Sequence, residues 1–254
     1  MSLSFLEYNN SHFGTQKIAY RKTNGDGPGI VFLPGFKSDL TGTKAQAVAQ
    51  WASHHNRDCL LFDYFGHGAS SGDFKDGTIS GWREEVTTII KTLTEGPQIL
   101  IGSSFGGYMA SLAALDLKDR IAGLVLVAPA FDMTERLMWN TFSDEDKASL
   151  TRDSFVHRGS EYDDEGYPIT EALINDGRAH QILNDPIDIN IPIAILHGQQ
   201  DDAVPWALSS EFAEKCNSRH IELFFLKSGD HRLSNPHEIS LLLTALDRML
   251  ETTA

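Results

Sequence analysis

The sequence predicts an α/β fold in which a doubly wound, mostly parallel sheet is covered by helices on both faces. Short apolar runs rich in β-branched residues, typical of strands buried on both faces, alternate along the chain with amphipathic stretches at helical spacing. Such alternation builds a parallel sheet through crossover connections. The length of 254 residues suits one domain of this type.

The elements follow in order along the chain. Residues 3–8 and 16–22 predict an N-terminal hairpin with Asn9, Asn10 and Ser11 near its turn. The buried strands are then expected at 29–33, 59–62, 98–101, 124–127, 193–196 and 221–226. The helices between them are expected at 44–54, 80–93, 107–117, 207–216 and 236–250.

One interval, residues 131–189, breaks the alternation. It has no convincing strand pattern, but it has helical propensity and aromatic residues interleaved with many charges. The charges alone fit the solvated acidic face of a surface excursion. The aromatic residues indicate packing, and a structureless loop of this length would be unusual in a compact domain. We therefore expect a small helical cap over the mouth of the active site, residues 131–189, inserted into a core formed by residues 1–130 and 190–254.

Composition and charge narrow the possible partners. The formal net charge of −14 disfavours nucleic acid as a partner. Cys59 and Cys216 lack metal spacing and are expected to be free buried thiols. No H-x-H or H-E-x-x-H pattern is present, so we expect neither a metal nor another cofactor.

Because the first seven residues lack the features of a secretion signal and no apolar run reaches transmembrane length, we expect a cytoplasmic protein without a membrane span.

The most informative motif is GSSFG at residues 102–106, a G-x-S-x-G pattern centred on Ser104. It directly follows the apolar run 98–101 and opens the helical stretch 107–117. So tight a turn between strand and helix strains the central residue and leaves room only for glycine on either side. The hydroxyl is then exposed beside a helix N-terminus whose free N–H groups can bind an oxyanion. The pattern predicts a nucleophilic serine.

A serine hydroxyl becomes nucleophilic only beside a base, and the base needs an acid that orients it. On such a turn the acid and then the histidine follow the serine along the chain. Asp201 lies in the loop after the strand 193–196, and His231 follows the last predicted strand, so both fall at the same edge of the sheet as Ser104. Asp202 is the alternative acid, although its position also suits turn or helix capping.

Two other histidines compete with His231. His67 lies in a loop that could approach the site. However, the glycines on either side of it favour a structural role in a turn. His197 precedes the acid loop, and we interpret it as a buried structural histidine rather than a catalyst.

The oxyanion donors are expected to be two backbone N–H groups. One belongs to Phe105, which follows the nucleophile, and the other to Phe36, in the loop after the strand 29–33. Gly35 lets that loop approach closely. Trp206, beside the acid loop, is a candidate for the wall of a substrate pocket, although an aromatic residue there also fits core packing.

Several further motifs accompany these residues. They are FLPGF at 32–36, GTKA at 42–45, FDY at 62–64, GPQIL at 96–100, LHG at 196–198, DD at 201–202, VPW at 204–206 and DHR at 230–232. With the serine motif they resemble the α/β-hydrolase family over nearly the whole chain after Pro28. Within that family the likeness is to a mitochondrial thioesterase and acyl-glucuronide esterase branch. Many relatives carry His-Gly where this chain has Pro34-Gly35.

The resemblance implies an α/β-hydrolase fold with Ser104, Asp201 and His231 in the catalytic roles. It implies a serine carboxylesterase or thioesterase that acts on a small-molecule or acyl-protein ester or thioester. A monoacylglycerol lipase or a serine peptidase of the same fold is an alternative. A non-catalytic small-molecule receptor is the alternative from another class. Location is not carried over, because the first residues lack the presequence expected of that branch.

Overall fold

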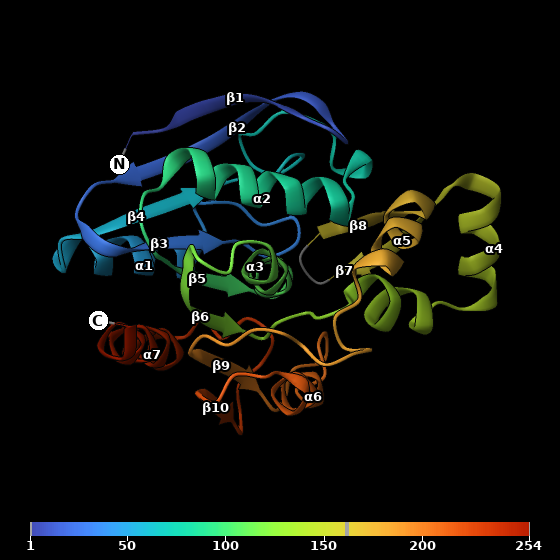
Figure 1. Ribbon diagram of the computed structural model, residues 1–254. Helices are drawn as coiled ribbons and strands as arrows, with labels where there is room; N and C mark the ends of the chain where they lie inside the picture. The colour runs from blue at the N-terminus through green and yellow to red at the C-terminus, as the bar shows by residue number, and fades with distance from the viewer. Residues whose placement is uncertain (1, 161–162, 254) are drawn as a thin grey trace.

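The centre of the molecule is an eight-stranded sheet (Figure 1), seen in a computed structural model that describes residues 2–160 and 163–253. Its strand order is β1-β2-β4-β3-β5-β6-β9-β10. The strands are β1 (Ser4–Asn10), β2 (Gly14–Thr23), β3 (Asp26–Leu33), β4 (Arg57–Phe62), β5 (Gln98–Ser103), β6 (Ile121–Val127), β9 (Ile193–Gly198) and β10 (Ile221–Leu226).

The strand directions confirm a mostly parallel sheet. β1 and β2 form the predicted N-terminal hairpin, and β2 also pairs antiparallel with β4. All pairs from β4 to β10 are parallel. The carboxyl ends of the central strands therefore lie at one edge of the sheet, where doubly wound folds place their ligands.

Helices cover both faces of this sheet, as the sequence predicts. α1 (Thr43–His54) and α7 (Pro236–Thr253) pack on one face. The other face is covered by α2 (Ile79–Leu93), α3 (Phe105–Asp116) and α6 (Ala207–Lys215). Side chains alternate between the two layers along each strand, because successive residues of a strand point to opposite faces. In β3, for example, Val31 belongs to one buried cluster and Phe32 to the other.

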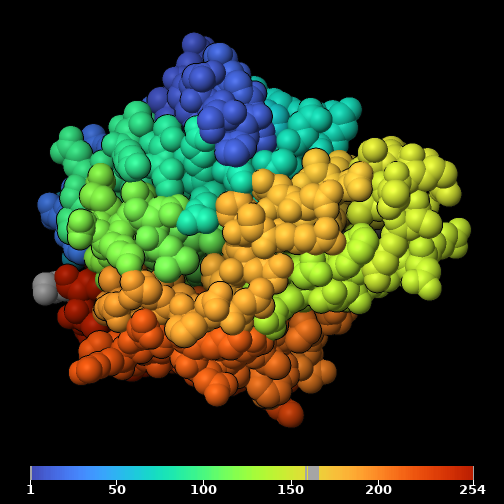
Figure 2. Space-filling view, turned by 45° about the vertical axis from the view of Figure 1, so that its right-hand side comes forward, coloured from blue at the N-terminus to red at the C-terminus, as the bar shows by residue number. Residues whose placement is uncertain are grey.

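The segment between β6 and β9 leaves the sheet and projects from one side of the molecule (Figure 2). It contains α4 (Asp144–Asp153) and α5 (Glu171–Gly177), but also a two-stranded antiparallel sheet of β7 (Phe155–Ser160) and β8 (Asp163–Thr170). The prediction that this segment holds no strand is therefore wrong. Acidic residues, glycine and proline are depleted in strands, and β8 contains all three. Its strand propensity is therefore low, and the strand forms because it pairs with β7.

Asp132 ties the beginning of this segment to its end. Its carboxylate, fully buried, accepts hydrogen bonds from the backbone N–H groups of Ile182 (2.7 Å) and Leu183 (2.9 Å). One turn later, Arg136 makes two hydrogen bonds, of 2.6 and 3.0 Å, to Glu211 on α6. These contacts fix the base of the segment against the core, so that its inner side keeps a defined position over the sheet edge.

Cys59 and Cys216 are free and buried, as predicted. Across residues 2–160 and 163–253, no helix has the length and apolar character needed to cross a membrane.

Candidate active site

Ser104 lies at the junction of β5 and α3, in a backbone conformation that few side chains adopt. Its φ is 54° and its ψ is −115°. The turn is possible because its neighbours lack side chains: a Cβ on Gly102 would overlap the carbonyl group of Gly106, and a Cβ on Gly106 would overlap the carbonyl oxygen of Leu33. The sequence motif thus folds into the tight strand-to-helix turn that it predicts.

We expect Gly106→Ala to lower the free energy of unfolding by about 1–3 kcal/mol, because the added methyl group meets rigid backbone rather than a movable side chain. The control is Gly159→Ala. A Cβ on Gly159 has no atom within 4 Å, so its effect should stay within about 0.5 kcal/mol. Urea denaturation followed by circular dichroism measures both values. Equal stability of the two variants would contradict this account of the turn.

Asp201 lies in the loop that follows β9, where its carboxylate is held by the backbone. Oδ1 accepts hydrogen bonds from the N–H groups of Ala203 (3.0 Å) and Val204 (2.7 Å). The side chain is 0% exposed. Because Oδ1 is occupied by these two donors, the orientation of the carboxylate is fixed, and Oδ2 is left to face other side chains.

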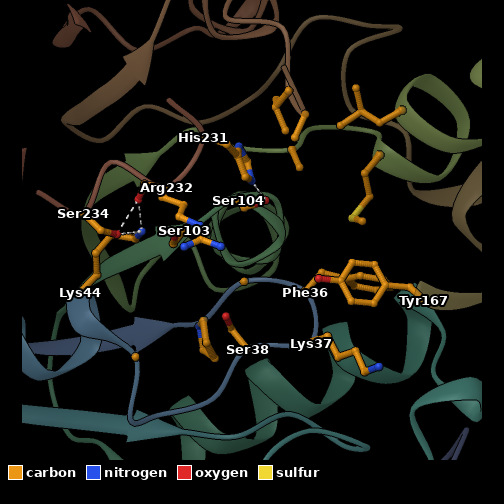
Figure 3. A pocket seen from close by; sticks show the side chains of 18 of the residues that line it. Phe36, Lys37, Ser38, Lys44, Ser103, Ser104, Tyr167, His231, Arg232 and Ser234 are labelled. Carbon is orange, nitrogen blue, oxygen red and sulfur yellow. Dashed lines mark hydrogen bonds between the residues drawn. The ribbon is translucent and has the colours of Figure 1, made fainter. Parts of the chain in front are cut away.

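His231 lies between Asp201 and Ser104 and contacts both. Its Nδ1 is 2.7 Å from Asp201 Oδ2, and its Nε2 is 3.0 Å from Ser104 Oγ. Figure 3 shows the imidazole directly above the serine, with the second of these hydrogen bonds drawn. Three side chains far apart in the sequence therefore form one continuous chain of hydrogen bonds, at the distances needed for proton transfer.

The electrostatics of this chain favour an ionised acid. Burial raises the pKa of Asp201, but hydrogen bonds from His197 and His231 and the charge attraction of His231 outweigh it. The net result is a pKa well below the usual range for an aspartate. Asp201 is therefore a carboxylate at neutral pH and can hold an imidazolium beside it.

The two residues expected to supply oxyanion donors lie on adjoining segments. Phe105 is the first residue of α3, so its N–H has no acceptor within the helix. The loop that carries Phe36 passes close to the serine, since a Cβ on Gly35 would be 3.8 Å from Ser104 Cβ. The rings of Phe36 and Phe105 pack edge to face with centroids 5.6 Å apart, and Phe36 also packs against Trp82. This packing fixes the backbone of both segments.

A cavity of about 680 Å³ opens above Ser104 and His231. The segment between β6 and β9 contributes part of its wall, and these residues were not identified from the sequence. They are Met133, Leu137, Met138, Gly159, Tyr167 and Ile169. The aromatic residues of this charged interval, Tyr167 among them, predict a cap over the mouth of the site, but the sequence does not indicate which side chains of the cap face the cavity.

The two sides of the cavity differ in polarity. Figure 3 places Phe36 and Tyr167 on one side of Ser104, and Lys44, Arg232 and Ser234 on the other. Burial lowers the pKa of Lys44 to about 8, against the opposing attraction of nearby acidic residues. Its ammonium group donates hydrogen bonds to the carbonyl oxygen of Arg232 and to Ser234 Oγ, at 3.3 Å in the second case. Lys37 also lies on the side of Phe36 and Tyr167, with its ammonium group 5.3 Å from the centre of the Tyr167 ring. The cavity thus has a mainly apolar, aromatic side that includes one cation, and a polar, charged side, with the serine between them.

The structure brings some of the other predicted residues to the site and leaves others outside. Asp202 lines the cavity, but Trp206 does not; the Trp206 ring packs against Phe225 and is 38% exposed. His67 is buried among aromatic rings, where burial lowers its pKa to about 4, and it does not line the cavity. His197 is buried as predicted, and its Nε2 lies 3.2 Å from Asp201 Oδ2.

Comparison with known proteins adds independent information. A model of the alpha/beta hydrolase family matches residues 30–240. The chain is 36% identical over 251 residues to the mitochondrial palmitoyl-protein thioesterase ABHD10 of Homo sapiens, covering 98% of this chain and 80% of the relative. Among solved structures it is similar to mouse alpha/beta hydrolase domain-containing protein 10, with a TM-score of 0.91 and 32% identity over the full length of both chains. A crystal structure from Agrobacterium vitis S4 matches with a TM-score of 0.93 and 33% identity, covering 98% of this chain and 99% of that one.

The comparisons overturn the prediction of a cytoplasmic location. The curated relatives that match 98% of this chain are mitochondrial proteins by name. The prediction relied on the character of the first seven residues. Residues 4–7 belong to strand β1, so their character reflects the pairing of β1 with β2 and carries no information about location.

Proposed function

Because this chain belongs to the alpha/beta hydrolase family, we propose that it is a serine hydrolase that cleaves carboxylic ester or thioester bonds of acyl substrates. The observation that carries the proposal is the line of hydrogen bonds from Ser104 through His231 to Asp201, with distances of 3.0 and 2.7 Å. No cofactor is required for this chemistry, since the side chains themselves supply nucleophile, base and acid.

The reaction proceeds in two halves. Ser104 Oγ attacks the acyl carbonyl carbon while His231 Nε2 takes up the hydroxyl proton, and Asp201 stabilises the resulting imidazolium. Collapse of the tetrahedral intermediate breaks the bond to the alcohol or thiol, which leaves with the proton from His231. Water then attacks the acyl-enzyme, with His231 again as base, and the carboxylic acid is released with Ser104 restored.

The oxyanion of each tetrahedral intermediate is held by the N–H groups of Phe36 and Phe105. The Phe105 amide directly follows the nucleophile, and the Phe36 loop lies against the serine from the other side. Donors of this kind stabilise the transition state more than the ground state, because negative charge develops on the oxygen only during attack.

The apolar side of the cavity is the place for the acyl chain. Several of its residues come from the segment 131–189, which we assign as a cap over the site, inserted between core residues 1–130 and 190–254. Relatives named palmitoyl-protein thioesterases fit this arrangement, since a palmitoyl group needs an extended apolar surface. The acyl group is therefore of medium or long chain length, and the alcohol or thiol lies toward the charged side.

We expect Leu137→Trp to lower kcat/KM for a decanoyl p-nitrophenyl ester about tenfold, with a much smaller effect on the acetyl ester, because the indole occupies space needed only by the longer chain. Asn140→Trp is the matched control: Asn140 is exposed on the same segment and does not line this cavity. Equal losses on both esters for Leu137→Trp would place the acyl chain elsewhere.

Turnover and covalent labelling of the purified chain test the reaction type. A single acyl group presented as a p-nitrophenyl ester, a thioester and an amide separates an esterase or thioesterase from a peptidase, because expulsion of an amine depends most on protonation by His231. A fluorophosphonate should form an adduct on the peptide that contains Ser104. If neither turnover nor an adduct is found, the chain is a non-catalytic receptor.

A further inference from the structure

His197 is a buried histidine that the proposed reaction does not use. It is the penultimate residue of β9, and its side chain is 0% exposed. Its ring connects three elements: its own strand, the loop that carries Asp201, and helix α6 through Ser209. A polar ring buried this completely must have its hydrogen-bonding groups satisfied, and its partners determine its protonation.

The partners of His197 fix which nitrogen carries the proton. Nε2 lies 3.0 Å from the carbonyl oxygen of Val204, which can only accept a hydrogen bond, so Nε2 must be the protonated nitrogen. Nδ1 lies 2.7 Å from Ser209 Oγ and accepts the hydroxyl proton in the neutral ring. The same Nε2–H group lies 3.2 Å from Asp201 Oδ2, so its positive end faces the carboxylate as well and helps to lower the pKa of Asp201.

Asp201 Oδ2 therefore faces two imidazole rings, His231 at 2.7 Å and His197 at 3.2 Å, while Oδ1 is held by backbone N–H groups. We propose that His197 is a positioning residue for Asp201: it holds Oδ2 in line with His231 and withdraws part of its negative charge. This inference rests on the proposed function, because it concerns the acid of the same catalytic chain.

The contact between His197 and Asp201 affects the pH dependence of the reaction. His231 must be neutral to accept the proton of Ser104. Without the His197 donor, more negative charge on Oδ2 is directed at His231, which favours the protonated imidazole. The acid limb of the kcat/KM profile should then move to higher pH.

Two substitutions separate this role from simple packing. The amide of asparagine reaches the place of Nδ1, so His197→Asn keeps a partner for Ser209 but removes the donor to Asp201. The longer glutamine places an N–H donor near Nε2, so His197→Gln retains it. We expect His197→Asn to lose about tenfold in kcat, with little change in KM, and to shift the acid limb upward by up to about one pH unit. His197→Gln should keep the acid limb near its original position.

The other ionisable groups around the site are the same in His197→Asn and His197→Gln. They therefore cannot cause a difference between the acid limbs of the two variants. Within the described residues Asp201 faces only His197 and His231 among ionisable side chains at hydrogen-bonding distance. Those that line the cavity with His231 are Lys37, Asp39, Lys44, Tyr167, Asp202 and Arg232. Identical acid limbs for the wild type, His197→Asn and His197→Gln would overturn the proposal.

A second measurement uses the wild-type protein, so that the role of His197 can be tested even if the His197→Asn variant folds poorly. In protein labelled with ¹⁵N-histidine, the ring shifts of His197, assigned from their absence in His197→Gln, should report a proton on Nε2 across the active pH range. A proton on Nδ1 instead would overturn the inference. Failure of the proposed function is distinguishable, since the wild type would then show neither turnover nor a fluorophosphonate adduct, or Ser104→Ala would retain turnover, whatever the ring shifts of His197.

Discussion

Ser104→Ala should lose about six orders of magnitude in kcat for a p-nitrophenyl ester, on the precedent of serine hydrolases with this constellation. It should also lose the fluorophosphonate adduct completely. The physical reason is that the alanine has no hydroxyl to form the acyl-enzyme, and only the oxyanion donors and substrate binding remain. The fold should survive, because the side chain removed is small and the strained turn depends on Gly102 and Gly106.

Ser103→Ala is the matched control for this variant. Ser103 precedes Ser104 in the motif and also lines the cavity, but no hydrogen bond joins it to His231 in the described part of the chain. It should retain the adduct on Ser104. Mass spectrometry of the labelled tryptic peptide measures both variants. Residual labelling of Ser104→Ala would require another nucleophile and would remove the basis of the mechanism.

Asp201→Asn should lower kcat about ten-thousandfold, and the structure explains how. Oδ1 accepts two backbone N–H groups, so the amide oxygen of the asparagine must take that place. The amide NH₂ then faces His231 Nδ1, which is 2.7 Å away. Two donors cannot face one another, so His231 is forced to carry its proton on Nε2 and can no longer accept the proton of Ser104.

Asp202→Asn provides the comparison. It removes the same charge from the neighbouring position, where the side chain is exposed and lines the cavity without contacting His231 in the described residues. On a neutral ester its loss should be far smaller than that of Asp201→Asn. Steady-state kinetics at the pH optimum measures both. A larger loss for Asp202→Asn would make Asp202 the acid of the reaction.

The sheet and its two helical layers could be predicted from the sequence because buried parallel strands are continuously apolar. The runs in β3, β5 and β6 have this property, and each is buried on both faces. The hairpin of β7 and β8 could not be predicted in the same way. Its strands are partly exposed and β8 contains acidic residues, so the segment resembles a solvated helical surface. The pairing of the two strands and the burial of Ile169 in the core stabilise them.

The positions of some site residues could likewise be predicted from the sequence, whereas the directions of other side chains could not. The carboxyl ends of parallel strands meet at one edge, so strand order was enough to expect Ser104, Asp201 and His231 near one another. Trp206 is adjacent in sequence to the acid loop, yet its ring turns away toward Phe225. The contact between His197 and Asp201 depends equally on the direction of two side chains.

For this protein the amino-acid sequence by itself determined the layered fold and the edge of the sheet at which its reactive side chains gather, because apolar periodicity and strand order are properties of the linear chain. Only the tertiary structure determined which residues line the cavity, that the Trp206 ring packs against Phe225 outside it, and that two imidazole rings contact the Asp201 carboxylate. These depend on side-chain direction and on packing between segments distant in sequence, which no local pattern encodes.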